Sequence, residues 1–138
     1  MIRRFTLVLD AASVACIKKP CPQKDDAAEV IGKMLEADVI VMATPVYFYA
    51  MSAQMKTLID RCCGPYTEMK NKEFYFIATA AEEDETIMKR VVDNFCGFLD
   101  CLENPVIKGT VFGGGVWHVG EIKDKPVLTE AYEMGKKV

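Results

Sequence analysis

The hydrophobic pattern along the chain predicts strands that alternate with helices. Short apolar runs typical of buried strands are separated by longer stretches with apolar residues at helical spacing. The predicted strands are Phe5–Leu9, Asp38–Ala43, Phe74–Thr79 and Val106–Phe112. Because these runs do not alternate with polar residues, they predict strands buried on both faces. A parallel sheet with helices on both sides, an α/β fold, has such strands.

The predicted helix starts carry capping residues. Asp25 or Asp26 precedes a helix over Ala27–Leu35, and Ser52 precedes the next helix. Asp84 precedes a long third helix, and Pro126 fits the first position of the last helix. The apolar face of the second helix holds Met55, Leu58, Ile59 and Cys62. The predicted buried positions along the third helix are Ile87, Val91, Phe95, Phe98, Leu99 and Leu102.

Composition and charge narrow the class of protein. The 138 residues suit one domain, 1–138, and the net charge of −3 gives no electrostatic footprint for nucleic acid or an anionic membrane. The apolar stretch Phe5–Leu9 is too short for a signal peptide, and the chain has no apolar run of about 20 residues that would span a membrane. We therefore expect a cytoplasmic protein.

The six cysteines do not form a recognised metal or disulfide pattern. No Cys-x-x-Cys pair occurs, and the one histidine, His118, is far from all six in sequence. Disulfides are rare in a cytosolic chain. Cys96 and Cys101 fall in a helical pattern and are predicted to be core or subsurface residues. We therefore expect no metal site.

Three consecutive aromatic residues follow the second predicted strand. Tyr47, Phe48 and Tyr49 lie in a loop between Val39–Met42 and the helix that begins near Ser52. In an open α/β sheet, ligands bind at the carboxyl ends of the strands. Exposed aromatic side chains there indicate a flat, apolar ligand such as a flavin ring. Packing of these side chains into the core or into a subunit interface is the alternative.

The segment 43–61 resembles the FMN-contacting loop of the NAD(P)H-dependent FMN reductase and iron-sulfur flavoprotein group. Three further segments support the resemblance: Lys24-Asp25-Asp26, residues 36–41, and the tail over 113–126 and 130–137. The resemblance implies a flavodoxin-like three-layer sandwich with a parallel sheet of about four strands. It also implies FMN as cofactor, NAD(P)H as electron donor, and a quinone, a nitro compound or free flavin as acceptor.

The resemblance further implies a homodimer with FMN in a cleft at its interface. The cofactor-binding residues that it implies are Thr44, Pro45, Val46, Tyr47, Phe48, Ser52, Thr79, Ala80, Ala81 and Trp117. None of these is expected to be a catalytic acid, base or nucleophile, because the flavin carries the reaction and the protein binds and orients it.

The amino-terminal region departs from the family pattern. The family usually opens with a strand and a Gly-Ser-Pro-Arg type loop whose amides hold the FMN phosphate, whereas residues 10–16 contain no glycine. About one strand and one helix are shortened or missing. Phe5–Leu9 is then either the second strand of the family, which leaves a gap in the sheet, or it occupies the first strand's place beside Val39–Met42. We favour the second placement, with Val39–Met42 central, because it leaves no gap.

The missing loop predicts weak or absent FMN binding. Ser13, Lys18 and Lys19 are the nearby candidates for holding a phosphate, while Asp25 and Asp26 would repel it. After the third strand, alanines stand where the family often has glycines, and Glu82 and Glu83 would oppose an anionic reduced flavin. Only two cysteines, Cys16 and Cys21, precede Asp25. An iron-sulfur cluster needs four ligands, so we expect no cluster here.

Two other features resemble functional sites. Gly113-Gly114-Gly115 follows a strand, but no helix begins there, so a tight turn under the edge of the sheet or close backbone packing is expected in place of a phosphate loop. His118 has no catalytic partner at a recognised spacing and is expected at the surface. The family resemblance implies an FMN-dependent NAD(P)H oxidoreductase. The alternative is a non-catalytic flavodoxin-like domain that lost its phosphate site and binds small molecules or forms dimers.

Overall fold

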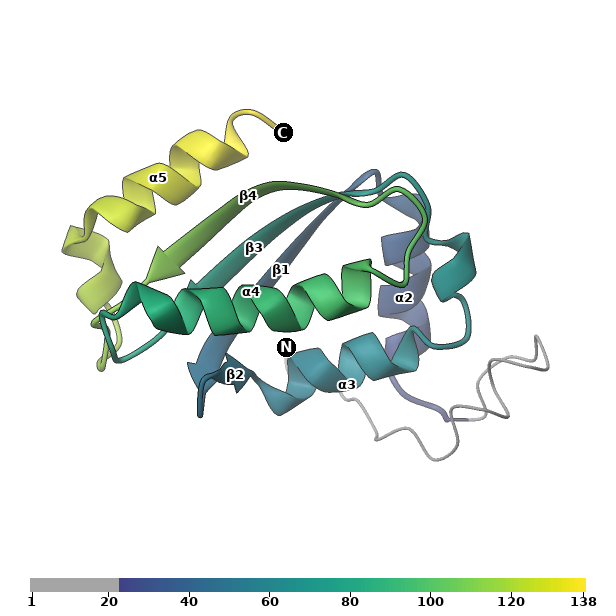
Figure 1. Cartoon of the computed structure of the whole chain (residues 1–138), viewed down its shortest axis with the longest axis horizontal. Coiled ribbons are helices and arrows are strands. Elements are labelled where there is room, and N and C mark those ends of the chain that lie inside the picture. Colours follow the sequence, from purple (N-terminus) through teal and green to yellow (C-terminus); the bar gives the residue numbers. More distant parts are fainter. Residues whose placement is uncertain (1–22) are drawn as a thin grey trace.

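The computed structural model of the protein describes residues 23–138 (Figure 1). The strands are β1 (Val39–Tyr47), β2 (Ala50–Met51), β3 (Glu73–Thr79) and β4 (Val106–Gly113). The α-helices are α2 (Ala27–Glu36), α3 (Ala53–Arg61), α4 (Glu85–Leu99) and α5 (Pro126–Gly135). Two short 3-10 helices, η1 (Tyr66–Glu68) and η2 (Glu121–Asp124), complete the described part. The predicted strand Phe5–Leu9 and the phosphate candidates Ser13, Lys18 and Lys19 lie outside it.

The strands form one sheet in the order β2-β1-β3-β4. β1 pairs in parallel with β3 and β3 pairs in parallel with β4, so Pro45, Thr79 and Gly113 lie side by side at the carboxyl edge. The pairing of Val39–Met42 with Phe74–Thr79 confirms that part of the predicted sheet. One pair differs from the predicted parallel sheet, because β2 folds back antiparallel on the end of β1.

Helices cover both faces of the sheet, as predicted. α2, α3 and α4 pack on one face, where the rings of Phe76 on β3 and Phe95 on α4 stack with centroids 4.4 Å apart. α5 lies on the other face, where Met134 leaves no room for a side chain at Gly109 of β4. The three layers are helix, sheet and helix, and the main core lies between the sheet and the layer formed by α2, α3 and α4 (Figure 1).

β1 is buried on one face only, which corrects the prediction of burial on both faces. Ile40, Met42 and Thr44 are buried, whereas Val41 is 54% exposed. The reason is the position of α5, which packs against β4 at the far side of the sheet from β1. β3 lies between its two parallel neighbours and is the more completely buried strand.

The predicted helix starts are confirmed at three helices. The Ser52 hydroxyl accepts the backbone N–H of Met55, the Asp84 carboxylate accepts that of Thr86, and Pro126 opens α5. At α2 the N-cap position is Asp26, but Asp25 supplies the carboxylate that accepts the N–H of Ala27 at 3.1 Å. The starts of α2, α3 and α4 therefore follow from a local side-chain contact that the sequence already contains, and the start of α5 follows from Pro126 at its first position.

Two predicted core assignments near the end of α4 need correction. Leu102 is buried as predicted, but it lies beyond Leu99, where the helix ends. Cys101 was predicted to be a core or subsurface residue and is exposed, because it follows the last helical turn and leaves the buried stripe. Cys96 is half-buried. Among residues 23–138, we find no helix with the length and apolarity needed to cross a membrane.

Candidate functional site at the carboxyl edge of the sheet

The aromatic segment forms a strained β-hairpin. β1 and β2 pair with Tyr47 opposite Ala50, so the turn between them consists of Phe48 and Tyr49 alone. Both residues have positive φ, 50° and 63°, as a type I′ turn requires. Such turns normally use Asn-Gly, because a large side chain at positive φ is strained. The hairpin thus holds two aromatic residues in a conformation that local sequence preference opposes.

The strained turn exposes its aromatic side chains. Phe48 is 100% exposed and Tyr47 is 60% exposed. Tyr49 has the Arg90 guanidinium of α4 above its ring, with 4.9 Å from Cζ to the ring centroid. This cation–π contact ties the turn to α4. The hairpin is held from one side while Tyr47 and Phe48 remain available to a ligand or a partner.

Two buried hydroxyl side chains brace the base of the hairpin. The Thr44 hydroxyl accepts the N–H of Ser52 at 2.9 Å and donates to the carbonyl of Pro45 at 2.8 Å. The Ser52 hydroxyl in turn caps α3. Both residues are less than a tenth exposed. Thr44 and Ser52 are therefore placed to shape the loop, and the exposed residues between them are placed to contact a ligand.

The ends of β3 and β4 are tied together next to this hairpin. The N–H of Ala80 donates to the carbonyl of Gly113 at 3.0 Å, and the carbonyl of Ala80 accepts the N–H of Val116 at 3.1 Å. Gly114 lies so close to the backbone of Glu82 that a Cβ would come within 2.8 Å of its carbonyl oxygen. Of the two predicted alternatives for the three glycines, close backbone packing is confirmed at Gly114.

The loop after β4 is organised by two charged side chains. The Glu121 carboxylate accepts the N–H groups of Trp117 at 2.6 Å and His118 at 2.9 Å, and these bonds lower its pKa below the usual range. The Lys125 ammonium donates to the carbonyl of Gly114 at 2.8 Å and lies 3.2 Å from the Glu83 carboxylate. Glu83, predicted to oppose an anionic flavin, is thus paired with a cation.

The structure brings all ten predicted cofactor-binding residues to the carboxyl edge of the sheet or to the loops next to it. Three of them, Thr44, Ser52 and Ala80, are buried. Pro45, Tyr47, Phe48 and Trp117 are exposed, and Val46, Thr79 and Ala81 are half-buried. The exposed set is apolar and aromatic, with Trp117 at 73%. This surface fits the flat ring of a flavin.

The described residues fit a phosphate less well than they fit a ring. A phosphate is normally held by free amides at a helix N-terminus. In residues 23–138, carboxylates occupy this position on α2 and α4, and the Ser52 hydroxyl occupies it on α3. Neither a cluster of three metal-binding side chains nor a metal pattern occurs in this part of the chain.

Three residues of this region were not predicted from the sequence. They are Arg90, which contacts the Tyr49 ring, and Glu121 and Lys125, which bind the backbone of the loop after β4. The predicted surface position of His118 is confirmed, since the residue is exposed. A spacing signal existed only for Glu121, which follows Trp117 by four residues. Arg90 and Lys125 could not be assigned, because Tyr49 and Glu83, with which they interact, lie far from them in sequence and local spacing gives no signal for such contacts.

The sequence of this chain is similar to those of known flavoproteins. The model of the family described as NADPH-dependent FMN reductase matches residues 6–118. An iron-sulfur flavoprotein of Archaeoglobus fulgidus is 31% identical over 140 aligned positions, which cover 90% of this chain and 69% of that protein. A Bacillus subtilis protein with the provisional name NAD(P)H-dependent FMN-containing oxidoreductase YwqN is 38% identical, with 84% of this chain and 68% of that protein covered.

The fold of this chain is also found in solved protein structures. The structure of the Trp repressor binding protein from Bacillus subtilis superimposes with a TM-score of 0.70. The match covers 83% of this chain and 74% of that chain at 23% sequence identity. At this identity the similarity establishes the flavodoxin-like fold and does not extend to the chemistry.

Proposed function

Because the chain belongs to the NADPH-dependent FMN reductase family, we propose that it is an FMN-dependent NAD(P)H oxidoreductase. The observation that carries this proposal is the family match over residues 6–118, which includes the whole carboxyl edge of the sheet. Bound FMN would accept a hydride from NAD(P)H and pass electrons to a second acceptor, such as a quinone, a nitro compound or free flavin.

The proposed site uses the ten residues gathered at the carboxyl edge. The exposed Pro45, Tyr47 and Phe48 would hold the flavin ring, together with Trp117 and the 79–81 loop. Thr44, Ser52 and Ala80 act as positioning residues, because they are buried and their polar groups bond within the protein. Backbone hydrogen bonds tie residues 80–82 to residues 113–116 and so fix the position of that loop.

The exposed aromatic residues also support a homodimer. Tyr47, Phe48 and Trp117 together leave much aromatic surface in water, and interfaces are enriched in such residues. We propose the cytoplasm as the compartment, because the spacing of the six cysteines in the sequence shows no disulfide framework and disulfides are rare in reducing compartments. The alternative remains a domain that binds small molecules or dimerises without catalysis, favoured by the lack of a Gly-Ser phosphate loop.

A single-turnover experiment separates the two functions. The purified protein is loaded with excess FMN and mixed anaerobically with NADPH or NADH, and protein-bound flavin absorbance near 450 nm is followed. An oxidoreductase bleaches this absorbance faster than free FMN with the same nicotinamide. The variant Tyr47→Ser should slow the bleaching, and Tyr132→Ser, an exposed tyrosine on α5, is the matched control. Bleaching no faster than free FMN would favour the non-catalytic domain.

A further inference from the structure

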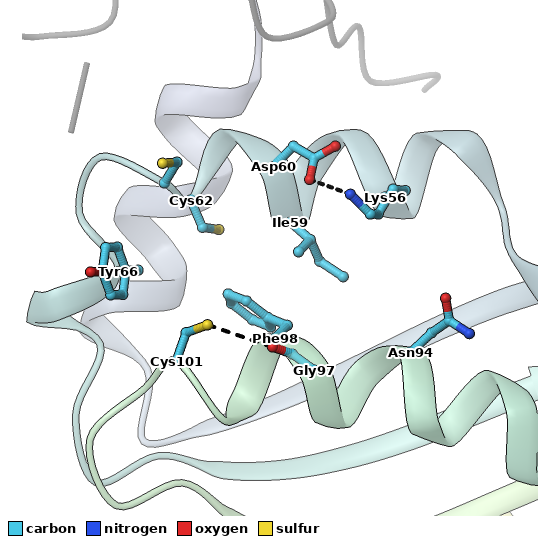
Figure 2. Close-up of a pocket in the computed structure, with 10 residues that line it drawn as sticks. Lys56, Ile59, Asp60, Cys62, Tyr66, Asn94, Gly97, Phe98 and Cys101 are labelled. Carbon is cyan, nitrogen blue, oxygen red and sulfur yellow. Dashed lines mark hydrogen bonds and ion pairs between the residues drawn. The ribbon is translucent and has the colours of Figure 1, made fainter. Parts of the chain in front are cut away.

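A cavity lies between the last turns of α3 and α4 (Figure 2). It has a volume of about 720 Å³, within the range of small-molecule pockets. Its walls are Ile59, Tyr66 and Phe98 together with sulfur atoms from Cys62, Cys63 and Cys101. α3 and α4 both run back from the carboxyl edge, so this cavity lies toward the end of the sheet where the strands begin (Figure 1).

Among the described residues that line it, the cavity carries no unbalanced charge. Lys56 and Asp60 are the charged ones within residues 23–138, and they form an ion pair with each other across one turn of α3. Asn94 adds one neutral amide at the α4 side, where an N–H of its side chain donates to the carbonyl of Arg90 at 2.7 Å. Among the described lining residues, its amide carbonyl and the Tyr66 hydroxyl are the neutral side-chain acceptors, and the Asp60 carboxylate is already paired with Lys56. A neutral ligand with one hydroxyl or N–H group suits this lining.

The sulfur atoms make the wall apolar and polarisable. Burial raises the pKa of the Cys62 thiol to about 12, with a smaller effect from the Asp60 carboxylate, and the thiol donates to the carbonyl of Leu58. This thiol stays neutral at physiological pH and behaves as an apolar group. Sulfur atoms contact aromatic rings favourably, and Phe98 and Tyr66 add aromatic surface. The wall therefore favours a flat aromatic ligand over an aliphatic one.

We propose that this cavity is a second ligand site, and that it takes a neutral, bicyclic aromatic molecule with one hydrogen-bond donor on its edge. The proposal does not depend on the proposed function, because the cavity shares no residue with the flavin site at the carboxyl edge. A ligand here would bind whether or not FMN is present.

Gly97 provides a variant that fills the cavity without disturbing the core. It lies on α4 in the cavity wall, and a Cβ at this position meets no atom within 4 Å. A leucine side chain there enters the space that the ligand needs. Gly32 on α2 also has no atom within 4 Å of its Cβ position and does not line the cavity. Gly32→Leu is therefore the matched control, and both changes favour helix formation.

The test is calorimetric titration of the full chain with 2-naphthol, a neutral bicyclic aromatic with one hydroxyl group. We expect saturable binding to the wild type and to Gly32→Leu, and binding weaker by at least about tenfold in Gly97→Leu. Gly97→Ala should give an intermediate loss. 2-Naphthalenesulfonate, of the same shape but charged, should bind less well than 2-naphthol. Circular dichroism confirms that each variant is folded.

Alkylation of Cys101 by iodoacetamide gives an independent readout, because this exposed thiol lines the cavity. 2-Naphthol should slow modification of Cys101 and leave Cys96, outside the cavity, unchanged, as mass spectrometry can determine. Equal affinity in wild type and Gly97→Leu, or no saturable binding up to roughly millimolar 2-naphthol, would overturn the proposal. Protection of Cys101 that rises with protein concentration alone would show that a second copy fills the cavity, and would also overturn it.

Discussion

At the scale of single residues, the hairpin turn carries the clearest conflict between local preference and structure. Phe48 and Tyr49 both have positive φ, a conformation that costs a residue with a side chain roughly 1–2 kcal/mol. Strain of this kind persists where the surroundings determine the conformation, and it is concentrated at functional sites. Here two sets of contacts hold the turn in this conformation. They are the pairing of β1 with β2 and the contact between Arg90 and the Tyr49 ring.

Replacing Tyr49 tests the strain directly. Tyr49→Gly and Tyr49→Ala both remove the cation–π contact with Arg90, worth about 0.5–1 kcal/mol at such an exposed position. Only glycine relieves the positive φ. We therefore expect Tyr49→Gly to be more stable than Tyr49→Ala by about 1–2 kcal/mol in urea unfolding. Equal stability of the two variants would show that the turn is not strained.

A buried ion pair is the second feature at this scale. Arg61 at the end of α3 binds Asp25 ahead of α2, with 2.6 Å between Nη1 and Oδ2, and both side chains are 3% exposed. Removing one partner of such a pair leaves an uncompensated buried charge, which costs about 3–5 kcal/mol.

We expect Arg61→Leu to lower the free energy of unfolding by about 3 kcal/mol. The double variant Asp25→Asn, Arg61→Leu should recover part of the loss, because asparagine is neutral and can still accept the N–H of Ala27. Urea unfolding of the single and double variants measures both changes. A double variant less stable than Arg61→Leu would contradict this account of the pair.

At the scale of elements, the loop between β4 and α5 depends on one carboxylate. Glu121 accepts the N–H groups of Trp117 and His118, and these hydrogen bonds lower its pKa below the ordinary value of 4.5. Because the folded-state pKa is depressed, the ordered loop is favoured above the unfolded-state pKa. That preference is lost as the pH falls through the folded-state pKa.

The fluorescence of Trp117 should report this change, since it is the single tryptophan. We expect constant emission near neutral pH and a step as the pH falls below 4.5. Glu121→Gln should lack the step, with Glu130→Gln, an exposed position on α5, as the control. Far-ultraviolet circular dichroism must stay constant over the same range. A step that persists unchanged in Glu121→Gln would assign it to another group.

Most elements could be predicted from the sequence, because their signals are local. Ser52, Asp84 and Pro126 mark helix starts through side chains next to them in sequence. β2 was missed, since Phe48-Tyr49 lacks the Asn-Gly pattern of a tight hairpin. The pairing of Arg61 with Asp25 spans 36 positions and has no local signal. The candidate site was predictable in outline because the ends of parallel strands meet at one edge.

At the scale of the whole molecule, the exposed aromatic surface predicts association. A monomer has a mass of 15.4 kDa, so light scattering at micromolar concentration should give about twice that value. Phe48→Ser removes a ring that is 100% exposed and should weaken the dimer without lowering stability. Tyr132→Ser, exposed on α5, is the control. A 15.4 kDa species for the wild type would contradict the dimer.

The affinity for FMN also depends on the whole molecule, because the flavin ring and the phosphate group of FMN would be bound by different parts of the chain. The ring surface at Pro45, Tyr47 and Trp117 is present, whereas the helix N-termini of α2 and α4 in residues 23–138 carry carboxylates. Charge-assisted hydrogen bonds contribute about 1.5–3 kcal/mol each, so a site without two or three of them would bind FMN more weakly by several powers of ten.

We therefore expect FMN and riboflavin to bind with affinities within about tenfold of each other, and the purified protein to be colourless or only partly yellow. Titration of both ligands against Trp117 fluorescence gives the ratio, and Tyr47→Ser should weaken both equally, because Tyr47 meets the ring they share. A nanomolar FMN constant with a large preference over riboflavin would contradict this prediction. It would mean that Ser13, Lys18, Lys19 or a second subunit provides the phosphate site.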